Sequence, residues 1–182
     1  MAELDALKTV ADLMCLAART APKTGGLDVI LAKTLRGQEK DRIAEEMDRI
    51  AREAGQAWFT RDADNLRASP VCLLLGAKSQ RLWQRLSLNL GAFCGFCGFA
   101  DCAANEAAGA VCAFNQIDLG IAASSAAAVA ALHHADCRMM YTVGTAARRL
   151  DLFGQPVVAA IGIPLSGTGK NPFFDRKPPK TT

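Results

Sequence analysis

The sequence has few aromatic residues, little net charge and no long apolar run. Aromatic side chains make up 6% of the 182 residues, and the formal net charge is +3. A charge this small, without a basic stripe interleaved with aromatic residues, argues against a nucleic-acid partner. The longest apolar-rich stretch, residues 119–132, is shorter than the roughly 20 residues that a bilayer-spanning helix needs. We therefore expect neither a nucleic-acid partner nor a membrane location.

An export signal is also missing. Residues 1–5 contain no basic segment followed by an apolar one, so no signal peptide is expected and the sequence predicts a cytoplasmic protein. In a reducing cytoplasm, clustered cysteines are more often metal ligands or redox groups than disulfides. The seven cysteines are an odd number, which means that they cannot all pair.

The apolar content is high enough for a real core. Apolar residues make up 51% of the chain and charged residues 21%, which excludes wholesale disorder. The length fits one compact domain over residues 1–182. Abundant alanine beside few aromatic residues indicates closely packed helices.

The order of the predicted elements is typical of an α+β sandwich. Apolar residues at three- and four-residue intervals predict helices at residues 3–18 and 38–54. We also expect helices at 58–67, at 118–133, which is rich in small residues, and at 144–150, and a short one after Asp28. Apolar runs predict strands at 71–75, 137–143 and 156–163, with an irregular tail from Pro164. The strands come late and lack a βαβ rhythm. The sequence therefore predicts a mostly antiparallel central sheet flanked by helices.

Four of the cysteines lie within the short segment 93–112. Their spacing is Cys94-x2-Cys97-x4-Cys102-x9-Cys112. Thiolates so close in sequence can turn onto one centre, and four of them can hold a [4Fe–4S] cluster, a [2Fe–2S] cluster or a Zn²⁺ ion. Phenylalanines between the cysteines would shield sulfide from water, which favours a cluster. We therefore interpret residues 93–112 as a metal-binding loop.

The spacing does not name the metal centre by itself. It matches neither the bacterial nor the plant-type ferredoxin pattern. We favour a cluster, and [4Fe–4S] over [2Fe–2S], while zinc and a set of merely small, buried residues stay open. The remaining cysteines lie within apolar patterns and are predicted to be core residues: Cys15, Cys72 and Cys137.

Two loops that contain glycine and proline have the composition of phosphate-binding loops. The first carries Arg19, Thr20, Lys23 and Thr24, and the second carries Lys170 and Arg176. Glycine exposes backbone N–H groups, hydroxyls donate hydrogen bonds and cations neutralise charge, so either loop could hold a phosphate. Residues 167–170 do not form a P-loop, because both the glycine spacing and the following residue are wrong. Taken alone, each loop is more typical of a solvated surface.

Five segments carry a resemblance to a known family. They are residues 17–24 (AARTAPKT), 94–97 (CGFC), 118–122 (DLGIA), 162–166 (GIPLS) and 169–176 (GKNPFFDR). Together they resemble a family of uncharacterised proteins that contain a ferredoxin domain, and the likeness covers nearly the whole chain. The resemblance implies an iron–sulfur cluster, which we expect the four clustered cysteines to hold: Cys94, Cys97, Cys102 and Cys112.

The sequence is also distantly similar to the FMN-dependent nitroreductases. That similarity implies a nitroreductase-like sandwich, into which we expect the cysteine-rich loop to be inserted, and a homodimer with the flavin at its interface. It makes the two loops halves of one FMN phosphate site, with these residues: Arg19, Thr20, Lys23, Gly162, Pro164, Lys170 and Arg176. Ser124 and Ser125 would lie near the flavin. The chain departs from these enzymes in its cysteine loop, its shorter length and its lack of a recognisable Pro-Ser-x-x-Asn segment.

The combined expectation is a cytoplasmic iron–sulfur flavoprotein that transfers electrons to a small molecule or a protein partner. A cluster exchanges single electrons and a flavin accepts one or two, so the pair converts between one- and two-electron chemistry. No residue stands out as an acid–base catalyst, and Tyr141 lies in a predicted strand. Two alternatives stay open: a non-catalytic electron carrier without flavin, and a zinc-stabilised interaction module.

Overall fold

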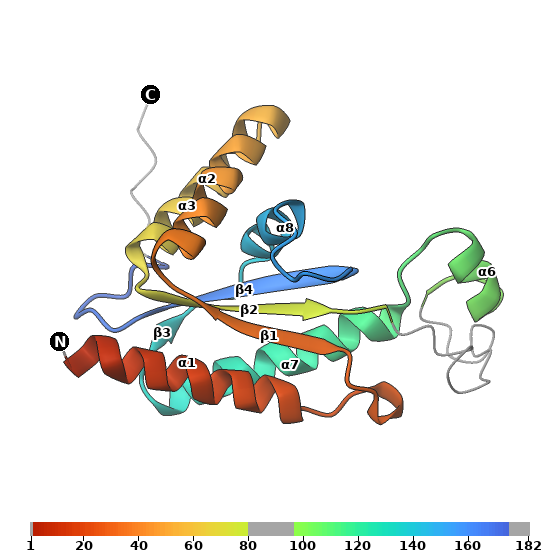
Figure 1. Ribbon diagram of the computed structural model, residues 1–182, viewed down its shortest axis with the longest axis horizontal. Helices are drawn as coiled ribbons and strands as arrows, with labels where there is room; N and C mark the ends of the chain where they lie inside the picture. Colours follow the sequence, from red (N-terminus) through yellow and green to blue (C-terminus); the bar gives the residue numbers. More distant parts are fainter. Residues whose placement is uncertain (1, 80–96, 175–182) are drawn as a thin grey trace.

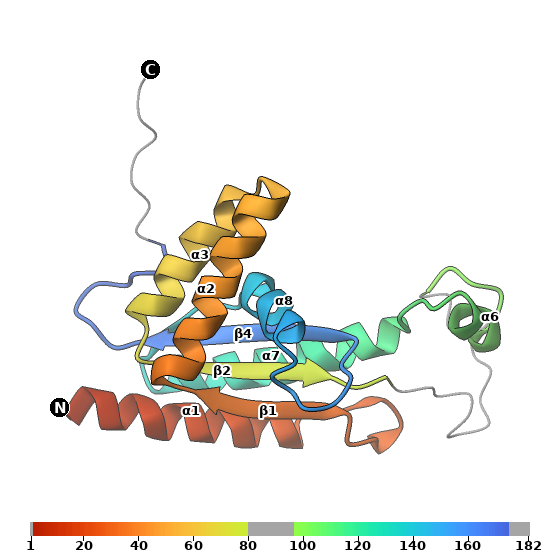
Figure 2. The ribbon, with the colours of Figure 1, turned by 45° about the horizontal axis from the view of Figure 1, so that its top comes forward.

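The computed structural model describes residues 2–79 and 97–174. Within these residues, four strands form one antiparallel sheet. The order is β1-β2-β4-β3, with β1 (Ile30–Leu35), β2 (Val71–Ala77), β3 (Asp136–Cys137) and β4 (Ala159–Ser166). All pairings are antiparallel. Figure 1 shows the sheet between two helical layers, and Figure 2 shows the same layers from a second angle. The predicted antiparallel sheet flanked by helices is confirmed.

Each face of the sheet is covered by its own helices. On one face lie α1 (Ala2–Thr20) and α7 (Ala113–Leu132), and on the other lie α2 (Gly37–Ala54), α3 (Ala57–Ala68) and α8 (Tyr141–Arg149). A 3₁₀ turn, η1 (Thr24–Gly26), follows α1, and α6 (Cys102–Ala107) precedes α7. None of the helices in the described part of the chain is long and apolar enough to cross a membrane.

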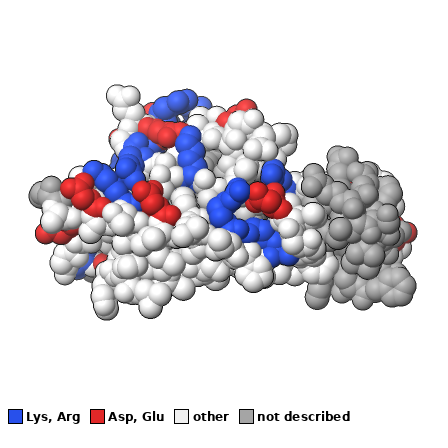
Figure 3. All heavy atoms as spheres, turned by 60° about the horizontal axis from the view of Figure 1, so that its bottom comes forward, with Lys and Arg blue, Asp and Glu red and all other residues white. Residues whose placement is uncertain are grey.

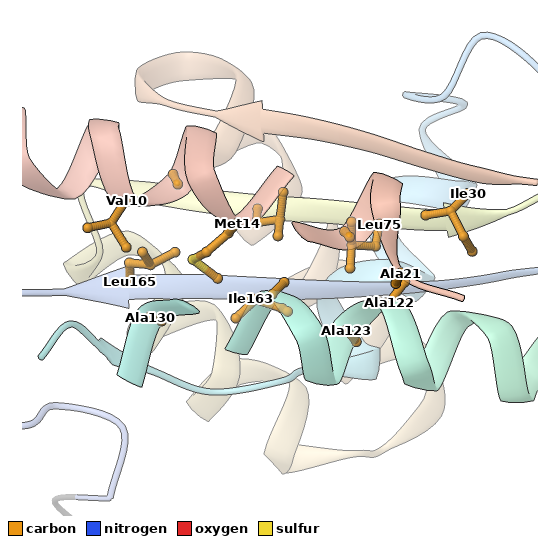
Figure 4. Close-up of a cluster of buried hydrophobic side chains, with 14 of the residues drawn as sticks. Val10, Met14, Ala21, Ile30, Leu75, Ala122, Ala123, Ala130, Ile163 and Leu165 are labelled. Atoms are coloured by element: carbon orange, nitrogen blue, oxygen red, sulfur yellow. The ribbon is translucent and has the colours of Figure 1, made fainter. Parts of the chain in front are cut away.

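Strand β2 is buried along its whole length because helices cover both of its sides. Val71, Leu73 and Leu75 pack with α1 and α7, whereas alternate residues between them pack with α2, α3 and α8. Figure 4 shows the first of these cores, in which side chains from α1, α7, β2 and β4 meet. A strand that is buried on both faces has a continuous apolar sequence, which is why residues 71–75 could be recognised as one.

The chain after Asp28 forms strand β1, so the predicted short helix is wrong. β1 pairs with β2 along its whole length, from Ile30 opposite Ala77 to Leu35 opposite Cys72. This pairing supplies hydrogen bonds and packing that outweigh a weak local helix preference. Asp28 caps no helix, because its carboxylate instead accepts a hydrogen bond from the guanidinium of Arg19.

The strand predicted at 137–143 is wrong for most of its length, and its last three residues are helical. Only β3 pairs with β4, Met140 makes an isolated bridge to Gly162, and α8 then begins at Tyr141. α8 lies directly on β4: a Cβ built on Gly144 would stand 2.0 Å from a carbonyl oxygen of that strand. A buried 2.9 Å hydrogen bond from Thr142 Oγ1 to an Asp62 carboxylate oxygen joins the start of α8 to α3.

Strand β4 extends past the predicted end at residue 163, so the chain is not yet irregular at Pro164. Pro164 lies opposite Cys72 of β2. Proline has no N–H to donate, and on the other side of β4 the pairing is interrupted between Cys137 and Met140. The helices predicted at 3–18, 38–54, 58–67, 118–133 and 144–150 are confirmed, although α7 begins earlier than expected.

Candidate functional site

Three of the four clustered cysteines lie beyond one end of the sheet, in residues 97–112, which we call the cysteine lobe (Figure 1). Cys102 is the first residue of α6, and Cys112 occupies the capping position before α7. Cys97 precedes α6, and all three thiols are half-buried. Cys94, the fourth predicted ligand, lies outside the described residues.

Cys97 and Cys102 both lie within electrostatic reach of the Cys112 thiol. Burial is the main cause that raises the pKa of the Cys112 thiol, and negative charge on Cys102 and Cys97 raises this pKa further. The backbone N–H groups of Phe114 and Asn115, in the first turn of α7, act in the opposite direction. A metal centre between the sulfurs would replace their mutual repulsion by attraction and favour the thiolates.

The described thiols do not form a compact set around a single point. Within residues 2–79 and 97–174, no three His, Cys, Asp or Glu side chains are grouped so that they could hold a metal ion. A tetrahedral Zn²⁺ with bonds of about 2.3 Å would place neighbouring sulfurs only about 3.8 Å apart. In a four-iron cluster each cysteine binds a different iron, so the ligand sulfurs are spaced more widely.

A buried amide lies in the same lobe. Asn105 is 6% exposed, and its Nδ2 atom has no hydrogen-bond partner among the residues that the structure describes. It follows Cys102 by three residues on α6, so the two side chains lie on one side of the helix. Buried donors are nearly always hydrogen-bonded. A metal centre in the lobe whose sulfur atoms accept hydrogen bonds would give this amide a partner. The sequence did not single out this residue.

The other three cysteines are core residues, as predicted. Cys72 is buried in the core beneath α2 and α8, while Cys15 and Cys137 pack against the core of α1 and α7. Burial raises the pKa of Cys72 to about 12 and that of Cys15 to about 11. These thiols stay protonated at neutral pH, which is the opposite of what a metal ligand requires.

The first predicted phosphate loop lies at the end of α1, near the cysteine lobe (Figure 1). Arg19 donates a 2.8 Å hydrogen bond to Asp28 and a 3.1 Å hydrogen bond to the carbonyl oxygen of Ile30. Lys23 donates to two carbonyl oxygens near the end of α1, and Thr20 Oγ1 donates to a carbonyl one turn earlier. The donors that we predicted for a phosphate thus make contacts within the chain.

An open hollow of about 370 Å³ is lined by residues between Arg19 and Asp28. Its size lies within the range of small-molecule sites. The side chains of Arg19 and Asp28 are 47% and 60% exposed, so their ion pair contributes at most about 1 kcal/mol. An anionic ligand could therefore replace Asp28 beside Arg19 at little cost.

Asp118 of α7 holds the turn η1 next to this hollow through hydrogen bonds. Its two carboxylate oxygens accept hydrogen bonds of 3.0 and 3.1 Å from the Thr24 N–H, and Oδ1 accepts a third of 3.0 Å from Thr24 Oγ1. Asp118 is 1% exposed. The predicted helix began at this residue, but α7 starts at Ala113, so the carboxylate lies in the second turn. The two partners are 94 residues apart, which is why no local sequence pattern reveals the contact.

The second predicted phosphate loop lies at the opposite end of α1. Lys170 follows β4, and a Cβ built on Gly167 would lie 3.3 Å from Cδ1 of Leu7. Leu7 is twelve residues, about 18 Å along the helix axis, from Arg19. Within one chain the two loops therefore do not form the single site that we predicted. Arg176 lies outside the described residues.

The remaining residues assigned to the flavin lie within regular elements. Gly162 and Pro164 are buried inside β4, and a Cβ on Gly162 would collide with Val143 at 2.2 Å. Gly162 is therefore required by the packing of α8 on the sheet. Ser124, which is exposed, and Ser125, which is half-buried, lie in the second half of α7.

Comparison with known sequences identifies two matches. A sequence model of the family described as "Uncharacterized protein containing a ferredoxin domain" matches residues 108–176. An uncharacterised protein from Archaeoglobus fulgidus is 41% identical over 184 residues, which cover 97% of this chain and 95% of that protein. The chain and this relative thus match over nearly their full lengths.

Several solved structures share the fold. Nitroreductase CinD from Lactococcus lactis, in complex with nicotinic acid, matches with a TM-score of 0.64 and 10% identity over 90% of this chain and 79% of its own. Nitroreductase A from Vibrio parahaemolyticus matches with a TM-score of 0.55 and 15% identity over 90% of this chain. The chain spans only 60% of that enzyme. These likenesses confirm the nitroreductase-like fold.

Asp118→Asn tests whether the buried carboxylate holds η1 in place. The substitution keeps the shape but sets an NH₂ group against the Thr24 N–H, so we expect a loss of about 1–3 kcal/mol in the free energy of unfolding. We also expect faster hydrogen exchange at the Thr24 amide. Thr24→Ser keeps both donors and should change the free energy of unfolding by less than about 0.5 kcal/mol. Equal exchange rates in Asp118→Asn and the unchanged protein would contradict this role.

Proposed function

Because this chain belongs to the family of uncharacterised proteins that contain a ferredoxin domain, we propose that it is an iron–sulfur flavoprotein that passes electrons to a small molecule or a protein partner. The family and the nitroreductase-like fold both point to a redox function. To this the proposal adds a cluster in the cysteine lobe and an FMN in the hollow beside η1. A cluster and a flavin together connect one-electron and two-electron chemistry.

The proposed cluster ligands are the four clustered cysteines: Cys94, Cys97, Cys102 and Cys112. The half-buried thiols of Cys97 and Cys102 lie within electrostatic reach of Cys112, which supports a metal centre shared by these residues. Backbone N–H groups at the start of α7 favour the thiolate of Cys112. We favour [4Fe–4S], since a four-iron core takes one thiolate per iron.

The proposed flavin site is the hollow at the end of α1. Arg19 would exchange its exposed contact with Asp28 for the FMN phosphate, which accepts a stronger, charge-assisted pair of hydrogen bonds. Thr20 and Lys23 would add a hydroxyl donor and a second cation. Lys170 and Arg176 would come from the C-terminal loop of a second copy of the chain, whereas Gly162 and Pro164, buried inside β4, would only position the start of that loop.

The observation that carries the proposal is that α7 joins the two candidate sites at one end of the molecule (Figure 2). Cys112 occupies the capping position of α7, and Asp118 lies six residues further, about 9 Å along the axis. Asp118 in turn holds Thr24, whose neighbours Lys23 and Gly26 line the hollow. A cluster and a flavin bound there would be neighbours, as electron transfer between them requires.

The outer side of α7 supports a homodimer. The only charged residue of this 20-residue helix is Asp118, which is buried, while Ile117 and Ile121 are exposed. Leu13 and Leu16 of α1 are also exposed. Figure 3 shows a broad area without Lys, Arg, Asp or Glu along the lower part of this face. A second copy packed antiparallel along α7 would bury it and bring its own C-terminal loop towards the hollow beside η1.

Cys97→Ser tests the cluster. Loss of one thiolate should remove most of the bound iron and acid-labile sulfide, together with the visible absorption of the cluster, from anaerobically purified protein. Cys137→Ser changes a core cysteine outside the lobe and should retain the cluster. Full iron and sulfide in Cys97→Ser would refute the ligand assignment. Zinc without sulfide in the unchanged protein would favour the zinc-stabilised interaction module.

Arg19→Gln tests the flavin site. Losing the charge-assisted contact with the phosphate should weaken FMN binding about tenfold, as measured by quenching of flavin fluorescence. Arg36→Gln removes a matched surface cation, whose ion pair with Asp12 is 3.7 Å long, and should leave FMN affinity unchanged. Equal affinities in the two variants would place the flavin elsewhere. A protein that binds iron and sulfide but no FMN would be an electron carrier without flavin.

Ile121→Glu tests the homodimer. A charge on the outer side of α7 should convert the dimer to a monomer in sedimentation analysis, because burying an unpaired carboxylate is costly. Thr60→Glu places the same charge on an exposed position of α3, on the opposite face of the sheet, and should leave the dimer intact. A dimer that persists in Ile121→Glu would show that α7 does not form the interface.

A further inference from the structure

The side-chain amide of Asn105 is a donor in the cysteine lobe that the described fold does not use. Asn105 is 6% exposed, and Nδ2 lacks a partner within residues 2–79 and 97–174. The backbone of the same residue is fully paired: its N–H donates to the Asp101 carbonyl at 3.2 Å, and its carbonyl accepts from Ala110 at 3.1 Å. The side chain is therefore not needed to complete the backbone hydrogen bonds around α6.

A proposed cluster ligand lies on the same helix as Asn105. Cys102 precedes Asn105 by three residues on α6, and the charges of Cys102 and Cys97 act on Cys112. The carboxylate at the start of α6 is already used, because Asp101 Oδ1 accepts a 2.8 Å hydrogen bond from the Ala104 N–H. The amide donor thus lies one helical turn from the Cys102 thiol, whose sulfur would become a stronger acceptor when it binds iron.

A buried donor without an acceptor destabilises a fold. We propose that Asn105 Nδ2 donates a hydrogen bond to a sulfur atom of the cluster and thereby raises the reduction potential of the cluster; this inference rests on the proposed function above. Reduction adds one electron, and hence negative charge, to the cluster. An N–H···S hydrogen bond is stronger to the more negative sulfur, so it stabilises the reduced form more than the oxidised form.

The test is the reduction potential of the cluster in Asn105→Leu, measured by following its visible absorption or its paramagnetic signal during an anaerobic redox titration. Leucine has a similar size and removes the donor. We expect the reduced-to-oxidised ratio at a fixed ambient potential to fall about tenfold, which for a one-electron couple is a shift of about 59 mV to more negative values. Asn105→Ala, which is smaller, should shift the potential in the same direction and guards against a steric effect of leucine.

Asn171→Leu provides the matched control. Asn171 is half-buried after β4, away from the lobe, and its Nδ2 already donates a 2.8 Å hydrogen bond to Asp136. Its substitution should lower the free energy of unfolding and leave the cluster potential unchanged.

The possible outcomes separate the inference from the proposed function. Unshifted potentials in both Asn105 variants, with full iron and sulfide, would overturn the inference while the iron–sulfur proposal stands. Loss of the cluster in both variants, with helix content retained, would assign Asn105 to cluster assembly and also overturn its role in setting the potential. An unchanged protein that holds no iron or sulfide would refute the proposed function, and the inference with it.

Discussion

The buried contact between Asp118 and Thr24 determines how one end of the molecule is built. A carboxylate taken out of water needs hydrogen-bond donors, and the N–H and hydroxyl of Thr24 supply three hydrogen bonds. They tie the turn after α1 to the second turn of α7. One helix, α7, therefore holds both the hollow beside η1 and the cysteine lobe, which contains Cys112. Any coupling between a flavin and a cluster in this protein depends on that arrangement.

The scaffold and the cysteine lobe differ in what stabilises them. β2 is covered on both faces, and both hydrophobic cores are assembled around it. In contrast, residues 97–112 contribute no side chain to either core, and the Nδ2 of Asn105 lacks a partner there among the described residues. A cluster bound by the lobe would supply the cohesion that apolar packing does not, since metal binding and local folding are thermodynamically coupled. In the proposed function, the sheet would support a segment whose folding depends on the metal centre.

The sequence predicted what depends on local pattern. The apolar stripes of α1, α2 and α3 and the continuous run of β2 were sufficient to place those elements, and the cysteine spacing marked the lobe. β1 was missed because its strand character comes from pairing with β2, forty residues later. The Asp118–Thr24 contact spans 94 residues and leaves no local signal. The unpartnered donor of Asn105 could be recognised only once its burial was known.

The central claim is that one protein holds a cluster and a flavin side by side. The most direct measurement is the quantification of iron, acid-labile sulfide, zinc and released FMN on a single anaerobically purified sample, together with its absorption spectrum. The account predicts iron and sulfide in equal amounts, about four of each per chain for a [4Fe–4S] centre, with FMN released on denaturation. A colourless protein that contains zinc and neither sulfide nor flavin would contradict it.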